Sequence, residues 1–146
     1  MDNLGKILAI DYGTKRLGLA VCDSGRTMAF GRGILDRSKG MKTVGQFLQK
    51  LCVDEGIKEV VFGLPLGNEN EETEQTERVR NFAKKLGLYL PDMRMSFFDE
   101  SFTSYQADQF LAQMELKPHE RRQSEDELAA IFILNRYLES QKGVQE

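Results

Sequence analysis

Apolar positions in the first part of the chain form short runs that are separated by turn residues. The run Ile7–Ile10 ends at Asp11 and Gly13, and a second run starts at Leu17. Another turn signal, Asp23-Ser-Gly25, precedes a third apolar run. Short runs bounded by such residues are typical of β-strands joined by tight turns. The pattern therefore predicts an antiparallel meander of three strands, over residues 6–11, 17–23 and 27–34.

After residue 40 the apolar residues recur at every third or fourth position. Val44, Leu48 and Leu51 follow this spacing, which is that of an amphipathic helix, and Gly56 is a natural C-terminal stop. Similar stripes occur at 79–86, 107–114 and 128–138, whereas short apolar runs at 58–63 and 93–98 predict strands. The predicted element order is β-β-β-α-β-α-β-α-α.

The start of the last helix is predicted from polar residues. Residues 115–123 indicate an exposed connection, and Ser124 and Glu127 then have the spacing of a capping box. We expect one domain over residues 1–140 and a polar C-terminal tail over 141–146. The predicted core face of this helix is Leu128, Ile131, Phe132, Asn135 and Leu138.

This order of elements predicts an α/β fold with a five-stranded mixed sheet flanked by helices. The first three strands pair antiparallel, and the later two return through right-handed crossovers, parallel to the first. Sites in such sheets form beyond the carboxyl ends of the parallel strands. The segments expected to converge there are Asp11–Gly13, Leu64–Leu66 and Asp99–Glu100, with Asp126 able to face the same place.

Composition indicates an ordinary soluble protein and excludes several chemistries. Of 146 residues, 40% are hydrophobic and 29% are charged, and no apolar run approaches the ~20 residues that cross a membrane. Cys22 and Cys52 are too few for a disulfide framework, so we expect reduced, buried thiols in a cytoplasmic protein. His119 is the only histidine, which argues against a histidine-based triad or metal site.

The net charge of −3 is unevenly distributed along the chain. Residues 1–50 hold nine Lys/Arg and four Asp/Glu, a balance of +5, whereas residues 51–146 hold eleven and nineteen, a balance of −8. An acidic protein is a poor candidate for tight, non-specific binding of nucleic acid. The basic first third could still form a local phosphate-binding face, and an uneven solvated surface is the alternative.

Three acids from distant segments, Asp11, Glu100 and Asp126, have the chemistry that a two-metal phosphodiester site requires. Mg²⁺ and Mn²⁺ prefer carboxylate oxygens and water, and two such ions about 3.5–4 Å apart activate a water and stabilise the leaving oxygen. Taken singly, each acid has a structural alternative: a turn acid, a solvated strand end, and an acid favoured near a helix N-terminus. Their expected convergence at one sheet edge favours the catalytic interpretation.

Residues around these acids predict how a substrate would be held. Gly13 would let a phosphate approach the backbone. Gly63-Leu-Pro-Leu66 either shapes the cleft as a rigid turn or is only a turn. The cations expected to hold a nucleic-acid backbone are Lys15, Arg16, Arg121 and Arg122.

Four motifs occur in a characteristic order: Asp11-Tyr-Gly-Thr-Lys-Arg-Leu-Gly-Leu-Ala20, Gly63-Leu-Pro-Leu66, Asp99-Glu100 with Thr103, and Asp126-Glu-Leu-Ala-Ala130. Together they resemble the YqgF family, also called RuvX-like, of the RNase H-like superfamily. The resemblance implies an RNase H-like fold, a cytoplasmic location and a nuclease that matures the 5′ end of 16S ribosomal RNA. It also implies Asp11, Glu100 and Asp126 as the catalytic, metal-binding set, with Thr14 and Thr103 beside the substrate.

Two positions depart from the pattern of that family. Ser101 stands where the family usually has arginine after the Asp-Glu pair, and Gly67-Asn-Glu-Asn70 replaces a Met-Asp-Gly-like segment. Serine cannot supply a cation that contacts phosphate. Substrate binding would therefore be weaker, or Arg121 or Arg122 would supply the missing cation.

The leading hypothesis is a Mg²⁺- or Mn²⁺-dependent nuclease that trims precursor ribosomal RNA. A Holliday junction resolvase would use the same fold and acids, but it normally works as a symmetric dimer, and the sequence leaves monomer or homodimer open. A non-catalytic nucleic-acid-binding module linked to transcription would not need the acids. A sugar-kinase or actin-like ATPase also uses Asp-x-Gly-Thr, but 146 residues leave no room for its two lobes.

Overall fold

Five strands and three helices make up the part of the chain that the computed structural model describes, residues 4–66, 71–99 and 118–144. The strands are β1 (Lys6–Tyr12), β2 (Arg16–Cys22), β3 (Ala29–Asp36), β4 (Ile57–Leu64) and β5 (Arg94–Asp99). The helices are α1 (Met41–Glu55), α2 (Glu74–Gly87) and α4 (Pro118–Val144), and none of these three is long and apolar enough to cross a membrane. The helix predicted over 107–114 lies outside the described residues.

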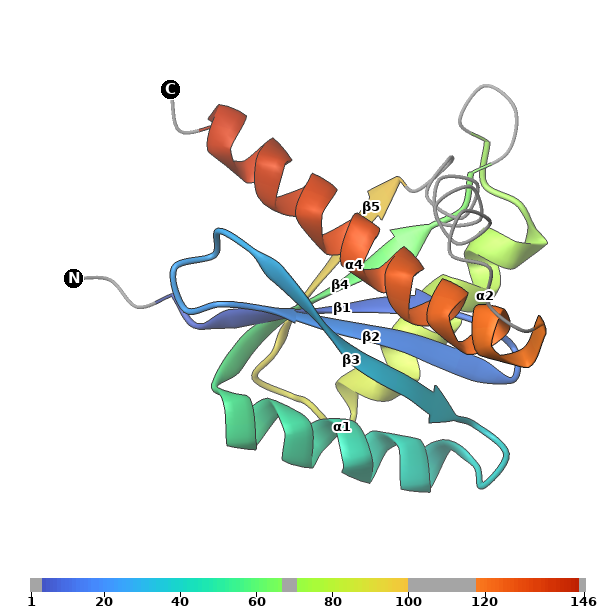
Figure 1. Cartoon of the computed structure of the whole chain (residues 1–146). Helices are drawn as coiled ribbons and strands as arrows, with labels where there is room; N and C mark the ends of the chain where they lie inside the picture. Colours follow the sequence, from blue (N-terminus) through green and yellow to red (C-terminus); the bar gives the residue numbers. More distant parts are fainter. Residues whose placement is uncertain (1–3, 67–70, 100–117, 145–146) are drawn as a thin grey trace.

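The strands form one mixed sheet in the order β3-β2-β1-β4-β5. Strand β2 pairs antiparallel with both β1 and β3, and β4 runs parallel to both β1 and β5. The predicted α/β class and five-stranded mixed sheet are therefore confirmed. The carboxyl ends of β1, β4 and β5 lie at one edge of the sheet, on the right in Figure 1.

Helices cover both faces of this sheet (Figure 1). On one face α1 and α2 pack over a buried cluster that includes Leu8, Ile10, Leu48, Phe62 and Phe82. On the other face α4 packs over a second cluster that includes Ile7, Ala9, Ile133 and Leu134. Because neighbours along a strand point to opposite faces, Asp11 lies on the α4 face and Tyr12 on the α1/α2 face.

Local signals in the sequence explain where α1 and α2 begin or end. Gly56 ends α1 in the left-handed conformation, with φ 68°. Its backbone N–H donates to the carbonyl oxygens of Cys52 and Val53, as is usual for a glycine C-cap. Thr73 caps α2 through a capping box with Thr76. Thr76 is fully buried, and its hydroxyl also donates to the Pro65 carbonyl at 2.6 Å, which fixes the turn after β4.

The start and the buried face of the last helix differ from the prediction. Because α4 begins at Pro118, residues 118–123 are helical rather than an exposed connection, and Ser124 lies inside the helix rather than at its cap. Proline suits a first helical position, where its missing N–H would have no partner. Of the predicted core face only Leu138 is buried, and the observed buried face is Ala130, Ile133, Leu134, Tyr137 and Leu138. The helix continues to Val144, into the segment expected to be a tail.

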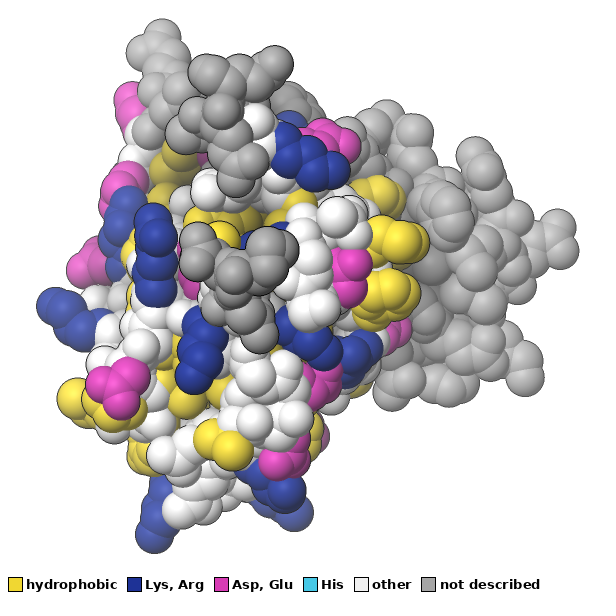
Figure 2. All heavy atoms as spheres, turned by 90° about the vertical axis from the view of Figure 1, so that its left-hand side faces the viewer, with side chains coloured by type: hydrophobic (Ala, Val, Ile, Leu, Met, Phe, Trp, Pro, Cys, Tyr) yellow, Lys and Arg dark blue, Asp and Glu magenta, His cyan; other side chains and the backbone are white. Residues whose placement is uncertain are grey.

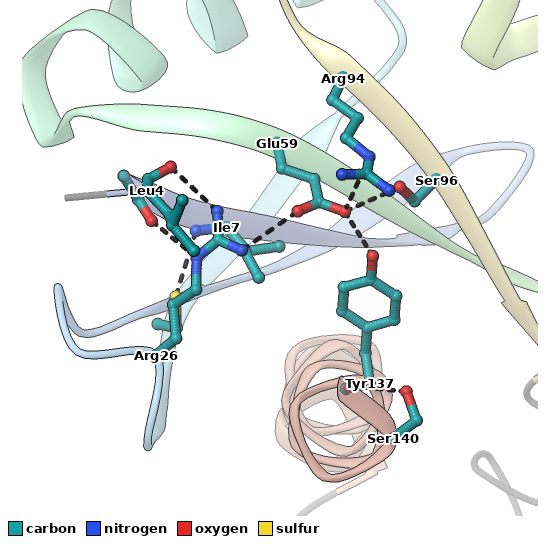
Figure 3. A network of polar contacts seen from close by, with 10 residues as sticks. Leu4, Ile7, Arg26, Glu59, Arg94, Ser96, Tyr137 and Ser140 are labelled. Carbon is teal, nitrogen blue, oxygen red and sulfur yellow. Dashed lines mark hydrogen bonds and ion pairs between the residues drawn. The ribbon is translucent and has the colours of Figure 1, made fainter. Parts of the chain in front are cut away.

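A buried carboxylate ties α4 to the sheet at the amino end of β4 (Figure 3). Glu59 is 3% exposed and accepts hydrogen bonds from the hydroxyl of Tyr137 and, at 2.8 Å, from Ser96 Oγ. The guanidinium groups of Arg26 and Arg94 lie 3.5 and 3.9 Å from its oxygens. Burial, together with the bond to Glu59, raises the pKa of Tyr137. This network fixes the C-terminal half of α4 against β4.

The surface at this end of the molecule has mixed charge. In Figure 2, which views it directly, Lys and Arg side chains lie scattered among acidic and apolar ones. Such a mixture favours no single sign of ligand charge. The parallel strands end at the opposite edge, where sites form in sheets of this kind.

Both cysteines are buried and free, as the sequence predicted. Cys22 Sγ accepts a hydrogen bond from Ile7 N at 3.1 Å. Burial raises the pKa of Cys52 to about 11. Neither thiol has the low pKa that reactive cysteines need.

Candidate functional site

The α4 backbone at Asp126 lies directly on β2, next to the strand position of Asp11. A Cβ atom placed on Gly18 would lie 1.8 Å from the backbone oxygen of Asp126 and 2.4 Å from its carbonyl carbon. Gly18 is the cross-strand partner of Asp11 in the register of β1 and β2. The helix and the acid-bearing strand thus meet on one face of the sheet, and the missing side chain of Gly18 permits this contact.

Glu127 fixes the same turn of α4 to the edge strand β3. Its Oε2 atom accepts a hydrogen bond from Gly33 N at 2.7 Å. The side chain crosses Gly31, where an added Cβ would lie 2.3 Å from Oε2. The capping box predicted for Ser124 and Glu127 is therefore wrong, because the helix has already begun at Pro118 and the glutamate reaches across to β3. No local spacing in the sequence signals this partner.

Arg16, predicted to hold substrate, forms an ion pair with Asp126. Its Nε donates to Asp126 Oδ2 at 2.7 Å, and the two side chains are 32% and 26% exposed. An ion pair this accessible adds only about 0–1 kcal/mol to stability, because water screens it. Its main consequence is local: the guanidinium offsets the charge of one predicted catalytic carboxylate and sets its orientation.

The turn between β1 and β2 is supported by Arg37, a residue that was not predicted from the sequence to belong to the site. Thr14 and Lys15 are exposed in this turn, and an added Cβ at Gly13 would lie 2.5 Å from Arg16 O, so the turn itself requires glycine. Arg37 Nη1 donates to Gly13 O at 2.7 Å and to Thr14 O at 3.3 Å. A cavity of about 400 Å³ beside the turn is lined by Thr14, Lys15, Arg16, Asp36, Arg37 and Ser38.

The third predicted acid, Glu100, lies outside the described residues, as do Ser101 and Thr103. Strand β5 ends at the exposed Asp99, which is in register with Leu64 of β4 at the same sheet edge. Within residues 4–66, 71–99 and 118–144, no three His, Cys, Asp or Glu side chains are grouped so as to hold a metal ion. Because Glu100 is not among these residues, the predicted metal set of three acids stays a prediction.

The other predicted contacts lie on the flanks of this edge. Leu64 ends β4, and the hydrogen bond from Thr76 to the Pro65 carbonyl anchors the following turn to α2; whether this turn shapes a cleft stays a prediction. Arg121 and Arg122 lie in the first turns of α4, and their side chains are outside the described part of the chain.

Known proteins resemble this chain over nearly its whole length. A family model described as "RuvX: Holliday junction resolvase" matches residues 5–140. A protein of Koribacter versatilis is 36% identical over 92% of this chain and 87% of its own length. One of Phocaeicola vulgatus is 33% identical over 97% of this chain and 100% of its own. Both are named "Putative pre-16S rRNA nuclease".

One solved structure supports the fold assignment. The structure of T. thermophilus RuvC in complex with Holliday junction substrate has a TM-score of 0.59 at 15% identity, and the match covers 94% of this chain and 96% of that one. At this identity the likeness shows the fold alone. It confirms the RNase H-like architecture that the sequence predicted.

Proposed function

Because the chain belongs to the RuvX family and is a nuclease, we propose that its substrate is precursor 16S ribosomal RNA and that it acts in maturing the 5′ end. The support is the name shared by relatives that match almost the full length of both chains. The expected place of action is the cytoplasm. Membership in a family of nucleases argues against the alternative of a non-catalytic nucleic-acid-binding module.

The catalytic residues we propose are Asp11, Glu100 and Asp126. The observation that supports this set best is the contact of α4 with Gly18, which puts the Asp126 backbone against the strand partner of Asp11. Carboxylate oxygens are the donors that Mg²⁺ and Mn²⁺ prefer, so the three acids fit such ions. Two bound ions would supply an activated water and stabilise the charge on the leaving oxygen.

Arg16 then has two tasks, orienting Asp126 and contacting substrate. A guanidinium has five N–H donors, and the bond from Nε to Asp126 uses one of them. The remaining donors can bind a phosphate oxygen, for which the planar fork is well shaped. Thr14 and Lys15, exposed in the same turn, extend this contact toward the next part of the strand. These residues would hold the scissile phosphate beside the carboxylates.

The direct test is cleavage of a 16S precursor transcript that carries its 5′ leader, with Mg²⁺, with Mn²⁺ and with a chelator. We expect metal-dependent shortening of the 5′ end by the wild type. Asp11→Asn should lower the rate by at least ~100-fold, because it removes a charged metal ligand. The control is Asp92→Asn, which neutralises an exposed acid in the loop before β5. Equal rates for the wild type and Asp11→Asn would show that the assigned site is wrong.

A four-way DNA junction is the second candidate substrate, because the family description names Holliday junction resolvase. Paired cutting of a symmetric junction needs two active sites related by two-fold symmetry, and hence a dimer. The same preparations should be given the transcript and the junction side by side, with the molar mass measured by light scattering. Symmetric cleavage by a dimer would favour the junction, and a monomer that ignores junctions would exclude it.

A further inference from the structure

A basic cavity lies on the face of the sheet opposite Asp11. Its volume is about 250 Å³, and it lies between α2, the end of β1 and the residue that follows β3. No carboxylate is among its described lining residues. The lining includes three cations, two aromatic rings and an amide, from Arg37, Arg78, Lys85, Tyr12, Phe82 and Asn81.

One of these cations, Arg37, is held in place before any ligand binds. The guanidinium carbon of Arg37 lies 4.7 Å from the centre of the Tyr12 ring and 4.9 Å from that of Phe82. Its Nη1 donates to Gly13 O at 2.7 Å. A side chain that is already ordered loses little conformational entropy when it binds an anion. Among the described residues no acid forms an ion pair with Arg37.

Helix α2 contributes the other two cations from a single face. Arg78, Asn81 and Lys85 are three and four residues apart, so their side chains lie above one another on that face. Arg78 has only a long contact of 3.9 Å with the exposed Glu74, and such a pair binds weakly in water. Lys85 forms no ion pair within the described part of the chain. The face therefore presents positive charge that the protein itself leaves largely uncompensated.

This cavity and the cavity beside the β1–β2 turn share Arg37 as a lining residue. A strand whose scissile phosphate lies near Asp11 on the α4 face would cross this turn, past Lys15 and Arg16, to reach the α1/α2 face. The two cavities thus mark a basic path around the edge of the sheet.

We propose that the cavity between Arg37, Arg78 and Lys85 is a phosphate subsite that binds the backbone of the substrate strand away from the bond that is cut. The inference rests on the proposed function in taking the substrate to be a nucleic-acid strand. Contacts to phosphates fix the position of a strand and are independent of its sequence. RNA and DNA both have a phosphate backbone, so the subsite would bind either strand and would not distinguish one base from another.

The test is the binding of a labelled single-stranded RNA, and of DNA of the same sequence, by fluorescence anisotropy with a chelator present to prevent cleavage. Lys85→Gln removes one cation of the subsite, and the matched control Lys84→Gln removes its exposed neighbour, which does not line the cavity. One lost phosphate contact should lower the slope of log K against log salt by about 0.7, and so weaken binding about fivefold at roughly 0.1 M salt. Arg78→Gln should have the same effect.

The outcomes separate this subsite from the proposed function. Weaker binding by Lys85→Gln and Arg78→Gln, with Lys84→Gln like the wild type, supports the subsite, and the strand affected identifies RNA, DNA or both. Equal binding by Lys85→Gln and the wild type, or equal weakening by Lys84→Gln, overturns the subsite even where the wild type cleaves the precursor. Failure of the wild type to bind either strand overturns the subsite, whereas the proposed function is overturned separately, by failure of the wild type to cleave the precursor with Mg²⁺ or Mn²⁺.

Discussion

Replacing Gly18 by alanine directly tests the close contact between β2 and the α4 backbone at Asp126. The added Cβ would lie 1.8 Å from the Asp126 backbone oxygen and 3.1 Å from the nitrogen of Glu127. These atoms belong to a helix backbone and cannot rotate aside as a flexible side chain could. The helix must therefore move away from β2, and Asp126 must move with it.

The size of the effect follows from the same distances. An ordinary carbon–oxygen contact is about 3.3–3.6 Å, so this turn of α4 must recede by roughly 1.5 Å. Overpacking costs typically 1–3 kcal/mol, and we expect about 3 kcal/mol here because the obstacle is backbone. For a domain of this size that lowers Tm by about 10 °C. The displacement also takes the Asp126 carboxylate away from β1. The cleavage rate should therefore fall even at temperatures where the variant is still fully folded.

Urea unfolding followed by circular dichroism measures the stability, and transcript cleavage at low temperature, where the variant is folded, measures the activity. The matched control is Gly87→Ala, because a Cβ at that helical position meets no atom within 4 Å. The control should leave stability unchanged or raise it by less than about 1 kcal/mol, because alanine is the better helix former and Gly87 is the last residue of α2. If Gly18→Ala unfolds at the same urea concentration as the wild type and cleaves at the same rate, the position of α4 does not depend on the absence of a side chain at residue 18.

Two further predictions concern stability. Tyr137→Phe removes a donor to the buried Glu59, so the free energy of unfolding in urea should fall by about 2 kcal/mol, and an unchanged value would mean that the network adds nothing. Hydrogen bonds from the Thr27 hydroxyl and from backbone N–H groups lower the pKa of Asp23 to about 2. Because this folded pKa lies below the unfolded one, the stabilisation is complete above about pH 4 and is lost as the pH falls through about 2. Asp23→Asn should therefore lose less stability than the wild type over that range in an acid titration followed by circular dichroism, and parallel curves would contradict this.

Local patterns were sufficient to predict most elements, and the last helix shows where they fail. Gly56 was predicted to stop α1 because a left-handed C-cap depends on one residue alone. The buried face of α4 depends instead on what it packs against. Ala129 and Ala130 are buried, whereas the larger Leu128 and Phe132 stay partly exposed. Large apolar residues occur on both the predicted and the observed face, so the spacing of large residues cannot choose between them, and the face that packs closely on the sheet is marked by its alanines.

The sequence was enough to predict which segments meet at the candidate site, because the order of elements determines this, but it was not enough to predict the individual side-chain partners. The order of elements was enough to expect Asp11 and the start of the last helix at one sheet edge. The bond from Arg16 to Asp126 joins residues 110 positions apart, and that from Gly33 to Glu127 joins residues 94 apart. Such partners depend on the register between α4 and the sheet, which no local spacing encodes. The role of Glu100 stays a prediction.

Two attachments of α4 to the sheet hold Asp126 at a fixed position in the candidate site. Near its C-terminal end the helix is held by the buried Glu59–Tyr137 bond, and about three helical turns earlier by Glu127 on β3. Between these points Ile133 and Leu134 are fully buried against the sheet. A helix fixed at two separated points can neither slide nor rotate without breaking one of them. The position of Asp126 over Gly18 is therefore a property of the folded chain, which would leave metal and substrate to determine only the partners of its carboxylate.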